Sequence, residues 1–313
     1  MPESFFVLTK ENLSLAIDEI IAISKSYDRF AKIHSEGNLV VVQTKTSYEK
    51  IAKRASFVKV AGQVVRKLST IFLENNNLAM ISETKTFSCR MLNLSSRNIN
   101  KQDIEKSLGS LISKFSGATV SLKKPEVVIY LVFTYSQSFF GFSKKSTTHS
   151  LKKVISHPHQ LDNKLTRAMI NLSGLSTGET VCDPFCGTGT TLVEAESMGI
   201  NSVGLDFDFK ICKASKKNLV ANGFGSLVIN ADYRYLKKIK NKFDGIVTDI
   251  PYGKNTKISE NPRKTISELL KIIPKRKKIA IMYKKGLEKK IDGANRHYDI
   301  YTHKSLTRTI LVR

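Results

Sequence analysis

The sequence lacks any long apolar segment. Its longest uninterrupted apolar runs, such as VVIYLVF at residues 127–133, are far shorter than the ~20 residues that a membrane-spanning helix needs. The amino terminus, MPESFFVLTKENLS, has no basic region followed by an apolar core, which is the pattern of a secretory signal. We therefore expect no membrane association and a cytoplasmic location.

Cysteine is also scarce. The four cysteines are Cys89, Cys182, Cys186 and Cys212. They form no C-x-x-C pair, and no histidine lies near them at the spacing of a metal site. Neither a disulfide framework nor a bound metal is indicated, so we expect reduced, mostly buried thiols.

Acidic residues are strongly outnumbered. The chain has 27 Asp and Glu against 51 Lys and Arg, a formal net charge of +24. This excess is larger than solubility requires and favours a polyanionic partner such as a nucleic acid. A compositional bias toward lysine is the alternative, because runs such as KRKK at residues 275–278 commonly coat solvated surfaces.

The first part of the chain predicts a small α/β module. Apolar patterning from residue 5 to about residue 65 gives the order strand, helix, strand, strand, helix, strand. That order is ferredoxin-like, an arrangement that recurs in RNA-binding proteins. The fold alone does not specify function.

A second α/β module is predicted between residues 72 and 142. FSCRMLNL reads as a strand, Asn100 as the N-cap of a helix, and the segment from Pro125 onward as a strand pair. A stretch rich in Ser, Thr, Lys and His follows and reads as a linker. The predicted boundaries are 1–68 for the first module, 69–143 for the second, 144–158 for the linker and 159–313 for the last domain.

The last domain alternates strands and helices. Near-continuous apolar strands separated by helices predict a parallel sheet covered on both faces, with an antiparallel pair at the end. The expected fold class is therefore α/β, with a doubly wound, Rossmann-like carboxy-terminal domain. In such sheets, ligands bind beyond the carboxyl ends of the strands.

The first of these strand ends carries the sequence DPFCGTGTT. Gly187 and Gly189 permit a tight turn and a close approach of the backbone to a ligand, and Thr190 or Thr191 is expected to cap the following helix. Leu192 stands where a dinucleotide fingerprint has its third glycine, which disfavours hydride chemistry.

The next strand ends carry three carboxylates. Asp206, 17 residues after Gly189, is placed to accept hydrogen bonds from the ribose hydroxyls of a nucleoside cofactor. Asp232 follows the third strand, where it can reach an adenine amino group. Asp249 ends the fourth strand in TDIPYG, whose proline stops the strand and fixes the exit of the chain. Turn chemistry and packing are the alternative explanation for this last segment.

Together, DPFCGTGT, GLDFD and TDIPYG resemble the motifs of class I S-adenosyl-L-methionine (AdoMet)-dependent methyltransferases that act on exocyclic amino groups. More narrowly, the chain resembles THUMP-containing tRNA guanine-N2 methyltransferases, especially the archaeal type that modifies guanosine 10. TFSCRML, EKSLGSLI and VSLKKPEVVIYLVF look like THUMP elements, and HKSLTRTILV looks like the terminal strand of the family. Ile250 departs from the pattern, since members of the family often have a proline there.

The resemblance implies a site and an activity. The implied catalytic residues are Asp249, Ile250, Pro251 and Tyr252; the implied AdoMet-binding residues are Asp183, Pro184, Phe185, Gly187, Thr188, Gly189, Thr190, Asp206, Asp232 and Asp249. The implied enzyme methylates N2 of a tRNA guanosine once or twice, acting either as a monomer or with a small protein activator. Another tRNA position, rRNA, adenine N6 of DNA, or RNA binding without catalysis are the alternatives.

Asp249 and the carbonyl of Ile250 are expected to accept the two N–H groups of the amine, while Tyr252 stacks on the extruded base. Three basic residues, Arg167, Arg308 and His157, are candidates for contact with RNA. Roles on a helix surface or at the end of a strand are equally open for them.

Overall fold

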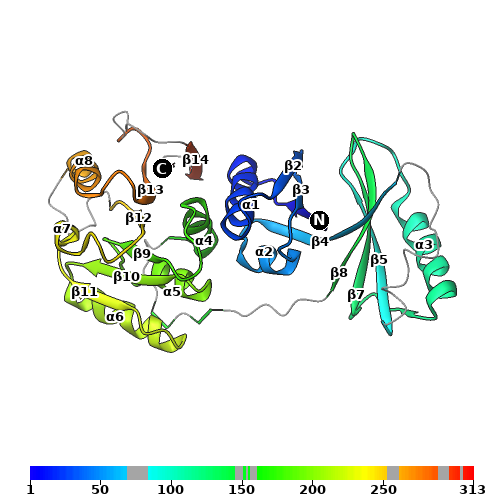
Figure 1. Ribbon diagram of the computed structural model, residues 1–313, viewed down its shortest axis with the longest axis horizontal. Coiled ribbons are helices and arrows are strands. Elements are labelled where there is room, and N and C mark those ends of the chain that lie inside the picture. The colour runs from blue at the N-terminus through cyan, green and yellow to red at the C-terminus, as the bar shows by residue number, and fades with distance from the viewer. Residues whose placement is uncertain are drawn as a thin grey trace. The chain divides into compact units, whose positions relative to one another are not determined.

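The structure is a computed structural model that describes residues 1–68, 84–144, 151–152, 154–155, 161–251, 261–287, 296–303 and 306–313. Contacts divide the chain into two compact units, and each is described by itself (Figure 1). The first unit comprises residues 1–13, 28–53 and 58–148, and the second comprises residues 14–27, 54–57 and 149–313.

The first unit is built on one eight-stranded sheet with the order β2-β3-β1-β4-β8-β7-β5-β6. Its elements are β1 (Glu3–Leu8), β2 (Lys32–Glu36), β3 (Leu39–Gln43), α2 (Tyr48–Arg54), β4 (Val58–Leu68), β5 (Thr86–Asn93), α3 (Lys101–Ser116), β6 (Thr119–Val120), β7 (Val127–Phe133) and β8 (Ser138–Lys144). With α1 (Leu13–Tyr27) between β1 and β2, the predicted order strand, helix, strand, strand, helix, strand is confirmed.

The sheet continues from the first predicted module into the second. Strand β4 pairs antiparallel with β8, and β8 pairs with β7, which runs parallel to β5. Asn100 caps α3 as predicted, since its side chain accepts from the backbone N–H groups of Gln102 and Asp103. The domain boundaries at residues 68, 143 and 158 stay predictions.

Phe5 lies at the centre of the core of the first unit. Its ring centroid lies 5.6 Å from that of Tyr130 and 5.4 Å from that of Phe139. Gly62 and Gly141 lie against the ring so closely that a Cβ atom at either position would collide with it. The two glycines therefore let the aromatic ring pack directly on the backbone of β4 and β8.

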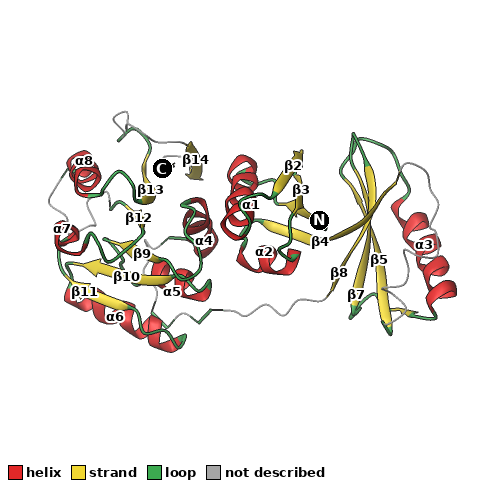
Figure 2. Ribbon diagram, in the orientation of Figure 1, coloured by secondary structure: helices red, strands yellow, loops and turns green. Residues whose placement is uncertain are grey.

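The second unit contains a seven-stranded sheet with the order β11-β10-β9-β12-β13-β15-β14. Figure 2 shows strands in yellow and helices in red. Its elements beside α1 are α4 (Asn163–Leu172), β9 (Thr180–Asp183), α5 (Thr190–Ser197), β10 (Asn201–Asp206), α6 (Phe209–Ala221), β11 (Leu227–Asn230), η3 (Tyr233–Tyr235), α7 (Leu236–Ile239), β12 (Gly245–Asp249), α8 (Pro262–Ile272), β13 (Lys278–Lys284), β14 (Arg296–His303) and β15 (Leu306–Val312). Strands β9 to β13 pair in parallel and β15 pairs antiparallel with both neighbours. The Rossmann-like α/β fold with its antiparallel terminal pair is confirmed.

Helix α1 groups with the second unit through a buried polar network. The carboxylate of Glu19, which has no exposed surface, accepts from Asn171 Nδ2 at 2.8 Å and from the backbone N–H of Ser56 at 3.0 Å. Arg54 Nε donates to Asn171 Oδ1 at 2.8 Å. Burial raises the pKa of Glu19, and these donors oppose that effect. The network joins α1 to α4, the helix that precedes the first strand of this sheet.

The described part of the predicted linker lies along α6. Backbone N–H groups of Val154 and Ile155 donate to Asn218 Oδ1, and that of Lys152 donates to Asn222 Oδ1 at 2.8 Å. The amide nitrogens of both asparagines donate back to carbonyl oxygens of this segment. Two asparagines one helical turn apart therefore tie the linker to the second unit.

The structure bears on two predictions from composition, one about the cysteines and one about membrane-spanning helices. All four cysteines are free and buried, as expected. Within the described ranges, no helix has both the length and the apolar character that crossing a bilayer demands.

Candidate active site

The site lies where the strand order of the second sheet reverses. Strand β9 is flanked on one side by β10 and on the other by β12, and all three run parallel. Loops leaving adjacent carboxyl ends therefore diverge here, which opens the crevice that ligands use in doubly wound sheets. Asp183 ends β9 and Asp249 ends β12, so both predicted residues lie at this point.

The loop after β9 is held in a tight conformation by backbone contacts. The N–H of Cys186 donates to the carbonyl of Leu205 at 2.9 Å, and that of Gly187 donates to Asp206 Oδ2 at 3.1 Å. Gly187 and Gly189 have φ of +52° and +86°, in the region that L side chains rarely adopt. The tight turn predicted for these glycines is therefore present, and their close approach to a ligand stays a prediction.

The predicted helix cap is wrong. Gly189, not a threonine, is the N-cap residue of α5, and no side chain caps this helix end. The Thr191 side chain instead hydrogen-bonds Asp183, since that buried carboxylate lies within reach on β9. This leaves backbone N–H groups of the first turn of α5 open to a ligand or to water.

Asp183 is buried and organises the loop. It accepts from Thr248 Oγ1 at 2.6 Å and from the backbone N–H of Phe185 at 3.0 Å, in addition to Thr191. Burial raises the pKa of Asp183 to about 6, and the negative charge of Asp249 acts in the same direction. Three donors thus hold one carboxylate where β9, β12 and α5 meet.

Asp206 retains the capacity to bind a nucleoside. Its Oδ1 accepts from the N–H of Asp208 at 2.9 Å and its Oδ2 from that of Gly187. Each oxygen can accept a further bond, so two adjacent hydroxyls of a ribose fit this carboxylate. The neighbouring Phe207 keeps 46% of its surface exposed and offers an aromatic surface beside it. These residues fit the nucleoside portion of AdoMet.

The remaining predicted cofactor residues occupy different positions around the loop. Pro184 and Thr188 are buried, and the Thr188 carbonyl accepts from Asn218 at 2.9 Å. The Phe185 ring packs against Tyr233 with centroids 5.3 Å apart. Asp232 caps η3 and forms an ion pair with Arg234 at 3.2 Å. Its contact with a cofactor stays a prediction, as do those of the other residues.

Asp249 ends β12, and its side chain contacts that of Arg308 on β15, on the far side of β13. Arg308 Nη2 donates to Asp249 Oδ1, and the two side chains retain only 11% and 22% exposure, respectively. Burial raises the pKa of Asp249 to about 6, whereas Arg308 acts to lower it. This position gives Arg308 an acidic partner at the end of β12, a pairing that no local sequence pattern indicates.

The backbone beyond Asp249 is fixed by the neighbouring strand. The N–H of Ile250 donates to the carbonyl of Met282 at 2.8 Å, and the Ile250 side chain is fully buried. Pro251 follows in a conformation outside any helix or strand. Tyr252 lies outside the described residues, as does His157.

Arg167 has internal partners that account for its position. Its guanidinium bonds Glu194 at 2.6 Å, Ser197 at 3.0 Å and the carbonyl of Arg54 at 2.9 Å. It therefore belongs to the polar network that joins α4, α5 and the Arg54 segment. These contacts agree with a structural role for Arg167, which the sequence left open beside contact with RNA.

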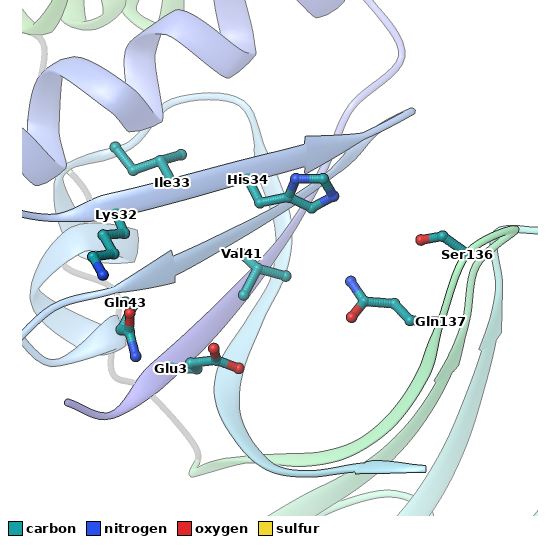
Figure 3. A pocket seen from close by; sticks show the side chains of 8 residues that line it. All are labelled: Glu3, Lys32, Ile33, His34, Val41, Gln43, Ser136 and Gln137. Carbon is teal, nitrogen blue, oxygen red and sulfur yellow. The ribbon is translucent and has the colours of Figure 1, made fainter. Parts of the chain in front are cut away.

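The first unit has a hollow that is lined mainly by polar side chains. The hollow has a volume of about 360 Å³ and is lined by Glu3, Lys32, Ile33, His34, Val41, Gln43, Ser136 and Gln137 (Figure 3). The side chains come from β1, β2, β3 and the turn between β7 and β8. In this lining, the positive charge of Lys32 is balanced by the negative charge of Glu3. The hollow therefore lacks the excess of positive charge that a phosphate site requires.

Comparison with protein families gives two matches. The family model described as "RMKL-like, methyltransferase domain" matches residues 151–292, and the model described as "DNA methylase" matches residues 2–217. The second match ends before Asp249. Both models describe methyl-transferring domains.

Curated relatives cover most of the chain. The tRNA (guanine(10)-N2)-dimethyltransferase of Methanocaldococcus jannaschii is 31% identical over 264 residues, covering 77% of this chain and 74% of that protein. The enzyme of the same name from Methanothermobacter thermautotrophicus is 28% identical and covers 99% and 98%. The U6 snRNA (guanine-N(2))-methyltransferase THUMPD2 of Bos taurus is 24% identical, covering 72% of this chain and 46% of that protein.

Among solved structures, TrmN from Thermus thermophilus matches with a TM-score of 0.58 and 16% identity, covering 100% of this chain and 99% of that one. A putative methyltransferase, SMU.472, solved in complex with SAH matches with a TM-score of 0.51 and 13% identity, covering 99% and 97%. At these identities the likeness concerns the fold.

Proposed function

Because this chain belongs to the same family as the tRNA (guanine(10)-N2)-dimethyltransferases, we propose that it methylates the exocyclic N2 of guanosine 10 in tRNA, once or twice. The observation that carries the proposal is the Asp249 carboxylate at the carboxyl end of β12, since β12 pairs in parallel with β9, which leads into the Gly187 loop, and β9 pairs in parallel with β10, which ends at Asp206. An amine-directed carboxylate and a nucleoside-binding carboxylate thus share one end of one sheet.

The residues around the loop after β9 would bind the cofactor. AdoMet supplies the methyl group when bound and leaves as the neutral thioether. The Asp206 oxygens would accept from the two ribose hydroxyls, while the backbone of Gly187 and Gly189 lets the ligand approach without a side chain in the way. Asp183 would act by holding this loop in shape through Thr191 and Phe185.

Asp249 and Ile250 would orient the substrate amine. The lone pair of guanine N2 is delocalised into the ring, so the nitrogen must be held in line with the methyl group. Asp249 and the Ile250 carbonyl would accept its two N–H groups, which stabilises the positive charge that develops on nitrogen. Proton loss from N2 to Asp249 or to water then completes the reaction. Stacking of the base on Tyr252 is inferred from the family motif alone.

The substrate class follows from charge and from the relatives. A net charge of +24 favours an RNA partner, and residues 69–143 are proposed to form a THUMP domain that contributes to RNA binding. The cytoplasm, where tRNA is available, is the proposed location. Action as a monomer or with a small protein activator remains part of the same proposal.

The experiment is methyl transfer from labelled AdoMet to an unmodified tRNA transcript, followed by nucleoside analysis. The control is the same transcript with guanosine 10 replaced by adenosine. N2-methylguanosine or its dimethyl form that disappears with the replacement supports the proposal. Persistence of the product places the target at another guanosine and contradicts the assignment to position 10.

A second function is favoured by one set of relatives. The THUMPD2 proteins are named for U6 snRNA, so a U6 transcript belongs in the same assay. A DNA duplex tests adenine-N6 methylation, which the "DNA methylase" model raises. Transfer to either substrate in place of tRNA would replace the proposal.

A further inference from the structure

Arg308 is placed in the site by the ladder of the antiparallel strand β15. In the register of the sheet, Asp249 lies opposite Met282, Met282 lies opposite Ile310, and Arg308 lies opposite Lys284. Arg308 is two residues from Ile310, so its side chain projects from the same face and closer to the carboxyl end of β12. Its position is therefore set by backbone pairing rather than by a surface loop.

The ion pair makes the two oxygens of Asp249 unequal, because Arg308 bonds one of them. Arg308 Nη2 donates to Oδ1, which leaves the acceptor capacity of Oδ2 for other donors. An arginine has fixed, planar donor geometry and stays protonated in proteins. It can therefore set both the orientation and the charge of the carboxylate it contacts.

Arg308 on β15 favours the ionised carboxylate of Asp249 through its charge and its hydrogen bond. The charge of Asp249 in turn raises the pKa of Asp183 on β9. Burial disfavours ionisation of Asp249. Without Arg308, burial would favour the protonated form of Asp249. A protonated carboxyl has fewer acceptor positions with which to hold an amine.

We propose that Arg308 is a positioning residue that keeps Asp249 ionised and presents its Oδ2 to the substrate amine. The inference rests on the proposed function for its catalytic consequence. The pairing itself is a property of this chain and can be tested without turnover.

The catalytic test compares Arg308→Gln with the conservative Arg308→Lys across the pH range. In Arg308→Gln, the acidic limb of kcat should move upward by about one pH unit, which lowers kcat about tenfold in that region. The loss should recover at higher pH, KM for tRNA should stay within about threefold, and Arg308→Lys should restore most of the wild-type profile. An unshifted limb, an equal loss at every pH or a change in KM alone would overturn the proposal.

A second measurement separates this inference from the proposed function. Stability to urea is followed against pH for wild type, Arg308→Gln and the double variant Arg308→Gln/Asp249→Asn. In Arg308→Gln, the fall of stability with rising pH should extend to higher pH, because the pKa of Asp249 rises. The double variant, which buries neither charge, should lose that component. If wild type methylates no RNA but this pattern appears, the proposed function fails and the pairing stands; an unchanged pH dependence overturns the pairing.

Discussion

Thr248 Oγ1 donates a hydrogen bond of 2.6 Å to Asp183 Oδ1, which joins the end of β12 to the end of β9. Neither residue keeps more than 3% of its surface exposed. The bond connects the strand that carries Asp249 to the strand that carries the glycine loop. The proposed amine site and the proposed cofactor loop therefore share one buried contact.

Replacement of Thr248 by valine should destabilise the protein by about 1–3 kcal/mol, because a buried carboxylate loses a donor while the side-chain shape is nearly kept. Urea unfolding measures the free energy, and titration measures AdoMet affinity, which should also fall. Thr248→Ser is the matched control because it retains the hydroxyl. A loss in the serine variant with none in the valine variant would show that the methyl group, not the hydrogen bond, matters.

The contribution of Asp183 and Asp249 to the stability of the protein should fall as pH rises from about 4 to about 6. Burial raises the pKa of both Asp183 and Asp249 to about 6 from 3.8. The folded state therefore holds these protons more tightly than the unfolded chain, so their contribution is largest at low pH and is lost as pH passes through about 6. Unfolding of wild type and Asp183→Asn across this range provides the measurement. An unchanged slope in the variant would remove Asp183 from this effect.

Alanine at Gly189 should be more damaging than alanine at Gly187. Both residues have positive φ, which costs a side chain about 1–2 kcal/mol. A Cβ at Gly189 would also collide with the Ser215 side chain, whereas nothing lies within 4 Å of one at Gly187. AdoMet affinity and urea unfolding should both show the larger loss for Gly189→Ala. Similar effects of the two variants would indicate that backbone strain alone decides the outcome.

Asp249→Ala should lower turnover by about a hundredfold or more, because an acceptor for the reacting amine is removed. Affinity for tRNA should stay within about threefold, since phosphate contacts elsewhere dominate binding. Single-turnover methylation and filter binding provide the two measurements. Asp249→Asn is the control for packing, and full activity of the alanine variant would exclude Asp249 from the mechanism.

Affinity for tRNA should fall steeply with salt. If basic side chains of the first unit contact phosphates, the logarithm of the association constant should decrease linearly with the logarithm of salt concentration, by about 0.7–0.9 for each contact. Binding measured at several salt concentrations gives the number of contacts. Affinity that does not change with salt would contradict electrostatic binding of the RNA backbone.

Element types and their order could be predicted from local patterns. Alternating apolar residues indicated the strands of the first unit, and Asn100 indicated the start of α3. Near-continuous apolar runs indicated the parallel sheet, which placed Asp183 and Asp249 at strand ends. The cap of α5 was predicted wrongly, because the Thr191 hydroxyl bonds Asp183 at the end of the preceding strand β9. The sequence showed both residues in one motif, but the path of the glycine loop between them decides which partner the hydroxyl takes.

The sequence by itself determined the elements, the glycine positions and the carboxylates at the ends of parallel strands, because these depend on residue type and spacing along the chain. Only the tertiary structure decided which partner each carboxylate acquires. Arg308 follows Asp249 by 59 residues, and Thr248 follows Asp183 by 65. These pairs form because strand order places β12 beside β9 and extends the sheet through β13 to β15. Sheet order is a property of long-range packing, and it sets the charges and hydrogen bonds of the site.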